Sequence, residues 1–131
     1  MMKIEGERWH IDNNRPVFIQ IMEIINNHIA SGFYQPGDKL PSVREIAAIA
    51  AVNPNTVQKA LGELERTGLI HSKRTTGRFV TEDESQIQAL KEDQVNLLIE
   101  TFYQGMEKLG YSRQEAVELV RVKKEEGQDE R

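Results

Sequence analysis

A short polar stretch at residues 53–59, Asn-Pro-Asn-Thr-Val-Gln-Lys, carries the residue types best suited to reading a nucleic acid. Asn and Gln amides can pair bidentately with adenine, a Thr methyl group can contact a thymine methyl group, and Lys can reach guanine or phosphate. The first residues of a helix also present unpaired backbone N–H groups that favour phosphate. The stretch therefore predicts a DNA-binding set of Asn53, Asn55, Thr56, Gln58 and Lys59.

A simpler interpretation applies to part of this stretch. Asn53 precedes Pro54, and an Asn followed by Pro at the first helical position is typical of a helix N-cap. Capping alone would explain Asn53, and Asn55 and Gln58 would then be ordinary solvated side chains. We favour DNA contact for Gln58 and Lys59, and both interpretations stay open for Asn53.

The preceding helix, expected at about residues 42–50, begins with two further candidates. Ser42 and Glu45 have the spacing of a capping box, in which each side chain accepts a hydrogen bond from the backbone N–H of the other residue. Arg44 stands in the first turn, where a cation opposes the helix dipole. This local cost favours a phosphate or guanine contact for Arg44, with an ion pair to Glu45 or Glu63 as the alternative. We include Ser42 and Arg44 in the DNA-binding set.

A third group of candidates lies in a predicted β-hairpin. Residues 69–71 and 78–81 read as short strands around a loop that contains Gly77. The cations of this hairpin, Lys73, Arg74 and Arg78, could lie along a DNA backbone or enter a minor groove. The alternative is a solvated sheet edge that charge protects from aggregation.

The helices that position these groups can be placed from apolar spacing and end signals. Helices are expected at residues 16–31, 42–50 and 54–66, and Gly32 and Gly68 end the first and the third. Only two or three residues separate the second helix from the third, which is the connection of a helix-turn-helix. Three helices followed by a hairpin predict a winged helix-turn-helix in a mainly α chain, with a first domain at residues 1–81.

The pattern changes after residue 82 to two helices, at about 84–109 and from 112 onward, followed by a charged tail. Two helices alone have little to bury against, so we expect their apolar stripes to pack on each other and on a second copy of the chain. Residues 82–131 are thus a predicted dimerisation region. Its candidate interface residues are Leu90, Val95, Leu98, Phe102, Met106, Leu109, Leu119 and Val120.

Composition excludes several other classes of protein. The 131 residues include no Cys, which removes disulfides, thiolate zinc sites and a Cys nucleophile. No apolar run approaches the ~20 residues of a membrane span, so no transmembrane helix is expected, and the absence of Cys fits a reducing, cytoplasmic setting. The three His residues lack ligand spacing, and no phosphate loop or nucleophile elbow is present. We therefore expect no metal, no cofactor and no enzymatic activity.

The net charge of −4 conceals an uneven distribution. Residues 1–80 hold ten Lys or Arg against eight Asp or Glu, whereas residues 81–131 hold seven against thirteen, so the two parts carry +2 and −6. Binding responds to the local potential rather than to the total charge. An acidic chain can therefore still present a basic DNA-binding face.

Three segments together resemble the DNA-binding domain of the GntR family of bacterial transcription regulators. They are residues 36–45 (PGDKLPSVRE), 52–57 (VNPNTV) and 63–70 (ELERTGLI), and the resemblance covers about residues 16–80. The Asn-Pro-Asn-Thr stretch and the short region after the wing are similar to the YtrA-like subfamily. That resemblance implies two dimerising C-terminal helices in place of a large effector domain.

The resemblance also implies a function and a set of contacts. Members of the family are dimeric regulators, usually repressors, that bind an inverted repeat, and in this subfamily they are often encoded beside transporter genes. Family contacts carry over to Arg44, Asn53, Asn55, Thr56, Gln58 and Arg74. Two positions depart from the family pattern. Gln58 replaces a common Arg, and Thr75, which joins the DNA-binding set, replaces a common wing-tip Gly and weakens close approach to a minor groove.

Two other functions remain as alternatives. A winged helix could serve as a protein-interaction adaptor that does not read DNA, with the acidic helical pair as its docking surface. A repressor that senses a small-molecule effector, bound between the wing domain and the dimer helices, is compatible with the main hypothesis. No polar constellation in the sequence identifies such an effector.

The base-reading hypothesis for Gln58 gives a testable prediction. Gln58→Ala should reduce discrimination against a wrong base by ~1–3 kcal/mol, because a bidentate amide contact is lost. Affinities for a bound sequence and for its single-base variants would measure this change. An equal loss of affinity for all sequences would remove Gln58 from base reading.

Overall fold

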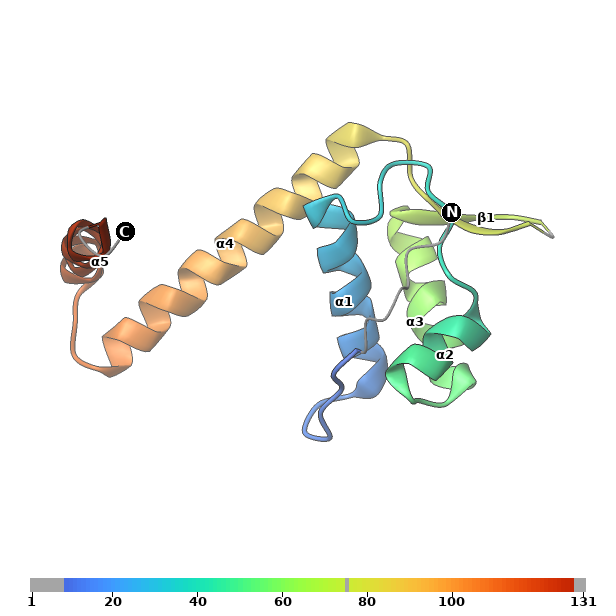
Figure 1. Cartoon of the computed structure of the whole chain (residues 1–131), viewed down its shortest axis with the longest axis horizontal. Coiled ribbons are helices and arrows are strands. Elements are labelled where there is room, and N and C mark those ends of the chain that lie inside the picture. Colours follow the sequence, from blue (N-terminus) through green and yellow to red (C-terminus); the bar gives the residue numbers. More distant parts are fainter. Residues whose placement is uncertain (1–8, 75, 129–131) are drawn as a thin grey trace. The chain divides into compact units, whose positions relative to one another are not determined.

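The computed structural model describes residues 9–74 and 76–128, with only the backbone at residue 128. The elements, in chain order, are α1 (Val17–Ser31), α2 (Val43–Ala50), α3 (Pro54–Thr67), β1 (Ile70–Lys73), β2 (Gly77–Val80), α4 (Glu84–Lys108) and α5 (Arg113–Gln128) (Figure 1). The predicted class, a mainly helical winged helix-turn-helix followed by two helices, is confirmed.

The starts of α2 and α3 follow the capping signals in the sequence. The Ser42 hydroxyl accepts a hydrogen bond from the N–H of Glu45, and the Glu45 carboxylate accepts one from the N–H of Ser42. The Asn53 side chain accepts a hydrogen bond from the N–H of Asn55 at 2.7 Å. Ala51, in the left-handed region at φ 56°, ends α2 and turns the chain sharply into α3.

A single hydrophobic core joins the three helices to the hairpin. α3 packs against α1, α2 and β1. Its buried apolar residues recur at helical spacing, and polar residues stand between them in the sequence. The largest fully buried apolar side chains are Ile21, Ile25, Ile29, Tyr34, Leu40, Ile46, Val57, Leu61, Leu64, Ile70 and Val80. This core sets the position of α3 and of the base of the wing.

The wing is an antiparallel hairpin in which Ile70 pairs with Val80 and Lys73 pairs with Gly77. Both strands reach further toward the loop than the sequence predicts, because a tight turn closes with the N–H of Thr76 bonded to the carbonyl of Lys73 at 2.8 Å. The segment before α2 adds to this sheet. The N–H of Leu40 donates to the carbonyl of Arg78 at 2.9 Å, so the sheet connects α2 directly to the wing.

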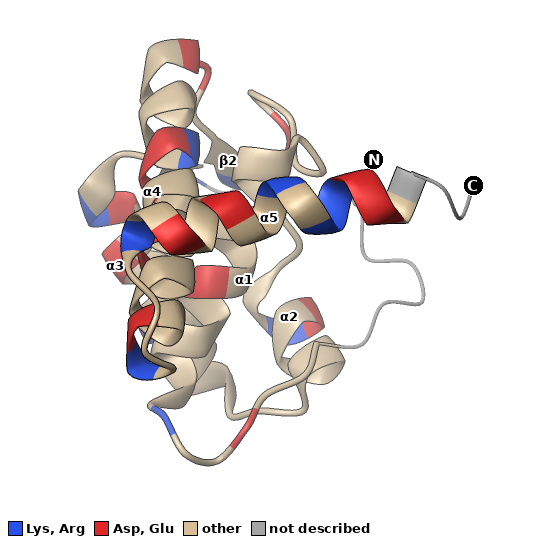
Figure 2. Ribbon diagram, turned by 90° about the vertical axis from the view of Figure 1, so that its left-hand side faces the viewer, with Lys and Arg blue, Asp and Glu red and all other residues tan. Residues whose placement is uncertain are grey.

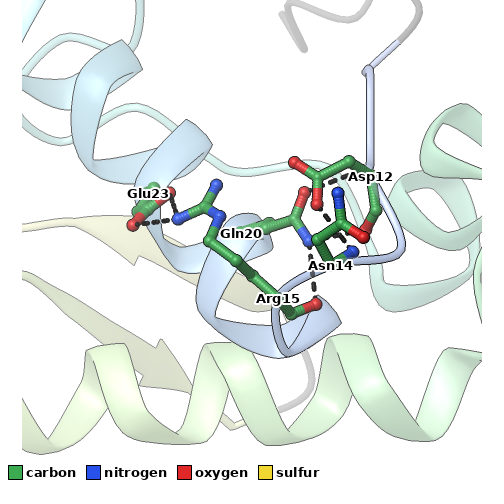
Figure 3. Close-up of polar contacts among 5 residues, drawn as sticks. All are labelled: Asp12, Asn14, Arg15, Gln20 and Glu23. Atoms are coloured by element: carbon green, nitrogen blue, oxygen red, sulfur yellow. Dashed lines mark hydrogen bonds and ion pairs between the residues drawn. The ribbon is translucent and has the colours of Figure 1, made fainter.

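The segment before α1 is attached to the core by one buried amide, as Figure 3 shows. The Gln20 side chain is 2% exposed. Its amide nitrogen donates to the carbonyls of Asp12 (2.8 Å) and Arg15 (3.0 Å), and its amide oxygen accepts from the N–H of Asp12 at 2.9 Å. Trp9 is also buried in the core. These contacts make the N-terminal arm, residues 9–16, a part of the folded domain.

The chain divides into two compact units, one that runs to Glu92 and one that begins at Asp93. The sequence places the boundary at residues 81 and 82, whereas the structure places it inside α4. The reason is that Ile87 and Leu90, on the first turns of α4, pack against the core of the first unit.

In the second unit, the start of α5 contacts the C-terminal half of α4. The Arg113 guanidinium contacts the carboxylates of Glu100 (2.6 Å) and Glu107 (3.4 Å) and stacks 4.7 Å from the centre of the Tyr103 ring. These carboxylates raise the pKa of Arg113, the hydrogen bond to Glu100 having the largest effect. Ala116, in the first turn of α5, is fully buried, and Arg113 holds the start of α5 to α4.

Loss of the Gln20 amide should measurably destabilise the first unit. Gln20→Ala removes three hydrogen bonds to the arm, and we expect it to lower the free energy of unfolding by about 2–3 kcal/mol. Chemical denaturation would measure this change. The matched control is Arg15→Ala, which removes a half-exposed ion pair with Glu23 and should cost less than ~0.5 kcal/mol. Equal effects of both changes would contradict the role of Gln20 in holding the segment before α1.

Candidate nucleic-acid interface

The N-terminal turns of α3 present their polar side chains to solvent. Asn53, Asn55 and Gln58 are exposed and Thr56 is half-buried, whereas Val57 between them is fully buried. Asn53 acts as the N-cap, as one of its two interpretations predicts. The start of α3 therefore offers amides at the helix end that a helix-turn-helix inserts into the major groove.

Lys59, from the same predicted set, reaches toward α1. Its Nζ lies 3.9 Å from the centre of the Phe18 ring. The ring face attracts the cation and limits its freedom, while the side chain as a whole stays exposed. Lys59 thus presents a charge beside α3 rather than at its very tip.

Arg44 of α2 is exposed, and no ion pair holds it among residues 9–74 and 76–128. Both carboxylates proposed as its alternative partners are engaged elsewhere. Glu45 completes the capping box with Ser42, and Glu63 pairs with Arg66 at 3.1 Å. The ion-pair interpretation of Arg44 is therefore not observed in the described part of the chain.

The wing places two of its predicted cations outward. Lys73 and Arg74 are exposed, and the Lys73 Nζ lies 4.6 Å from the centre of the Phe79 ring on the facing strand. Arg74 occupies the left-handed region at φ 38°, which is uncommon for a residue other than Gly, Asn or Asp. Thr75 lies outside the described residues.

Arg78, the third predicted cation of the wing, is turned inward. Its Nε lies 2.9 Å from the Glu65 Oε1 of α3, and its side chain is 20% exposed. Glu65 also accepts a hydrogen bond from the Ser72 hydroxyl at 2.6 Å. The hydrogen bond from Ser72 lowers the pKa of Glu65 most, and the bond and charge of Arg78 lower it further against the opposing effect of burial.

Sequence reasoning missed two residues of this region. Lys39 is exposed beside Phe79 in an isolated bridge, and it lines a cavity of about 330 Å³ between the start of α2 and the wing, together with Ser42, Thr76 and Arg78. Glu65 organises the wing. Neither position has a periodic sequence signal, because the residues that lie beside Lys39 and Glu65 in the fold are distant from them in the chain.

Ion pairing separates the arginines of the described part of the chain into two groups. Five of the seven contact a carboxylate: Arg15, Arg66, Arg78, Arg113 and Arg121. The other two, Arg44 and Arg74, have no carboxylate partner among the described residues. Both belong to the predicted DNA-binding set, and a guanidinium without a carboxylate is available to a phosphate.

The predicted dimerisation residues lie mostly on an exposed apolar face. Val95, Leu98, Phe102, Leu109 and Val120 are exposed, and Met106 and Leu119 are partly covered within their own unit. Leu90 instead packs against the core of the first unit. The structure adds exposed Leu97, Ile99 and Val117, which the sequence stripe did not include. Figure 2 shows both acidic and basic residues along α5.

Other kinds of site find no support among the described residues. No group of three or more His, Asp or Glu side chains in residues 9–74 and 76–128 could hold a metal ion. In the same part of the chain, no helix has the length and apolar character that a membrane crossing requires. The helix-turn-helix, the wing and the polar start of α3 define the class of winged helix-turn-helix DNA-binding proteins.

Comparison with known proteins identifies the family within this class. The family model described as "Bacterial regulatory proteins, gntR family" matches residues 19–80. The chain is 40% identical over 101 residues to the HTH-type transcriptional repressor YtrA of Bacillus subtilis, covering 72% of this chain and 78% of that protein. The chain belongs to the GntR family, is YtrA-like, and is a transcription regulator rather than an enzyme.

Two solved structures extend the comparison. A GntR family transcriptional regulator from Listeria monocytogenes is 40% identical, with a TM-score of 0.79 over 86% of this chain and 98% of that chain. The DNA-binding domain of AraR, solved in complex with operator ORX1, is 26% identical, with a TM-score of 0.52 over 58% of this chain and all of that chain. The first similarity includes most of the C-terminal helices, and the second is confined to a smaller part of the chain.

Because Arg44 has no carboxylate partner among the described residues, we expect its removal to weaken DNA binding without changing the stability of the fold. Arg44→Ala should leave the free energy of unfolding within about 0.5 kcal/mol of the unchanged protein, because no described contact is lost. It should nevertheless weaken DNA binding. Arg66→Ala, which removes the same charge from the C-terminal end of α3, is the matched control and should leave DNA binding nearly unchanged. Equal losses of affinity would mean that only total charge matters.

Proposed function

We propose that the chain is a homodimeric repressor that binds an inverted-repeat operator, with α3 in the major groove and the wing on the backbone or in the minor groove. The availability of Arg44 and Arg74 carries this proposal. Every other described arginine is neutralised by a carboxylate, and these two lie on α2 and on the wing, the elements that precede and follow α3 in the chain. Two such cations suit the phosphates on either side of a groove.

Base reading is assigned to the exposed start of α3. Asn55 and Gln58 are the amides that reach solvent there, and such amides can pair with adenine in the major groove. Asn53 is occupied as a cap, so its contribution is the orientation of the helix end. Lys59, held beside Phe18, supplies charge toward a phosphate rather than base contact.

Dimerisation through the second unit supplies the symmetry of the operator. Exposed apolar residues follow α4 at helical spacing from Val95 to Leu109, and a second copy of the same unit is the partner that buries such a face with closed symmetry. Two symmetric reading helices require two inverted half-sites, about one helical turn or 10 bp apart.

Repression and the regulated genes are proposed from relatives. The YtrA protein of Bacillus subtilis is named as a repressor, and the resemblance to its subfamily points to neighbouring transporter genes as targets. A bound dimer would act by occupying promoter DNA. This chain would then lower transcription of its own operon.

Binding to DNA from upstream of the chain's own gene tests the function. The protein should stay bound in the presence of excess nonspecific DNA, and its affinity should fall steeply between about 50 and 200 mM salt because phosphate contacts release counterions. The double variant Arg44→Ala/Gln58→Ala should lose this retention. Arg66→Ala/Gln88→Ala, with one Arg and one exposed Gln removed elsewhere, is the control and should keep it.

The opposite outcome would favour a different function. Weak binding that nonspecific DNA fully abolishes, on the upstream region and in a selection from random genomic fragments, would contradict the repressor. The protein-interaction adaptor would then be the better explanation of the acidic C-terminal helices.

The dimer hypothesis predicts different results for two neighbouring leucines of α4. Leu98 is 70% exposed and lies on the apolar stripe, and Leu97 is 64% exposed but lies roughly 200° around the helix from Val95. Leu98→Glu should yield monomers, because the interface would bury an unpaired charge, whereas Leu97→Glu should stay dimeric. Sedimentation equilibrium would measure both. A dimeric Leu98→Glu protein would place the interface elsewhere.

A further inference from the structure

The inward contact of Arg78 has a specific place in the hairpin. Ser72 of β1 and Arg78 of β2 are directly opposite each other in the register of the two strands. The two oxygens of one carboxylate, that of Glu65 on α3, accept from both residues: Oε2 from the Ser72 hydroxyl at 2.6 Å and Oε1 from the Arg78 Nε at 2.9 Å. A single α3 side chain therefore holds both strands of the wing.

We propose that Glu65 is a positioning residue that clamps the wing to the DNA-reading helix through Ser72 and Arg78, and that Arg78 does not bind phosphate. This inference rests on the proposed DNA-binding function. It assigns Arg78 to the protein's own structure, although a cation on a wing would ordinarily be assigned to DNA. It also divides the wing into a clamped base and a contacting tip.

The charges of the clamp support this division. The Arg78 and Glu65 side chains are 20% and 30% exposed, so their pair is better shielded from water than the other described ion pairs of the first unit, which are at least 39% exposed on each side. The pKa of Glu65 is lowered, because the hydrogen bond from Ser72 and the bond and charge of Arg78 favour its ionised form. To reach a phosphate, Arg78 would have to leave a shielded carboxylate without its partner, which is unfavourable.

The clamp lies immediately behind the tip of the wing. The next pair toward the loop is Lys73 with Gly77, and the turn beyond it is closed by the bond from the Thr76 N–H to the Lys73 carbonyl. Arg74 stands in this turn in a left-handed conformation. Because so few residues separate the clamp from Arg74, loosening the clamp should displace the charge that meets the DNA backbone.

The direction in which one substitution changes operator affinity distinguishes a positioning role of Glu65 from a purely electrostatic effect. Glu65→Gln removes a negative charge from a DNA-binding domain, so electrostatics alone predicts tighter binding. A clamp predicts the reverse. We expect operator affinity to fall about fivefold, which corresponds to a usual interaction energy between residues in contact. Glu63→Gln is the matched control, since it removes the same charge two residues earlier on α3, where Glu63 holds only exposed Arg66. It should bind as tightly as the unchanged protein or slightly more so.

The salt dependence of DNA affinity then tests whether Arg78 contacts a phosphate. Arg78→Met should weaken binding without changing the slope of log affinity against log salt, whereas Arg74→Ala should reduce the slope by about one unit. The double variant Glu65→Gln/Arg78→Met should bind DNA as tightly as whichever single variant binds less tightly, because both changes break the same clamp. A one-unit loss of slope in Arg78→Met, or unchanged or tighter binding by Glu65→Gln, would overturn the proposal.

Hydrogen exchange in the absence of DNA makes the clamp testable separately from DNA binding. Amides of residues 70–73 and 77–80 should exchange faster in Glu65→Gln and in Arg78→Met, while amides of α1 should not change. Glu63→Gln should leave the hairpin unchanged. If the unchanged protein fails to bind DNA specifically, the proposed function fails, and exchange still decides the clamp. Unaltered hairpin exchange in both clamp variants would overturn the clamp itself.

Discussion

The burial of one apolar face of α3 is the constraint on which the DNA-binding unit depends. Four residues of that face are at most 1% exposed: Val57, Ala60, Leu61 and Leu64. Fully burying one Leu or Val contributes about 1.5–3 kcal/mol, so the helix cannot rotate about its axis without losing several such contributions. The core thereby determines which side of α3 faces outward. The amides of Asn55 and Gln58 are on that side because the apolar residues occupy the other.

Polar contacts determine the directions of the N-terminal arm and the wing, which the apolar core alone does not specify. Apolar packing is non-directional, so it does not determine how an arm or a hairpin leaves the core. Two side chains with well-satisfied hydrogen bonds supply that direction: Gln20 holds the N-terminal arm, and Glu65 holds the wing. Each joins segments that are separate in sequence. The orientation of the wing therefore depends on a few directional bonds in addition to the burial of Ile70 and Val80 at its base.

Local signals explain why so much of the fold could be predicted from the sequence. The capping box of Ser42 with Glu45, the Asn53-Pro54 start and the helix-ending Gly68 each act within a few residues, and each was read correctly. The inward contact of Arg78 and the buried role of Gln20 were missed, because their partners are determined by the assembled fold. A Gln among apolar residues and an Arg on a hairpin look like solvated residues until the packing is known. The DNA-binding and dimerisation roles of the candidate residues stay predictions.

The pairing of most arginines with carboxylates has a kinetic consequence. A guanidinium already bound to a carboxylate offers little attraction to a phosphate, and the chain as a whole is acidic. A duplex that meets the first unit away from Arg44, Arg74 and the exposed Lys39, Lys59 and Lys73 therefore meets fewer available cations, and such encounters are brief. An approach toward the start of α3 and the wing tip is held long enough for the bases to be sampled. Selectivity for the binding orientation thus begins before any base is contacted.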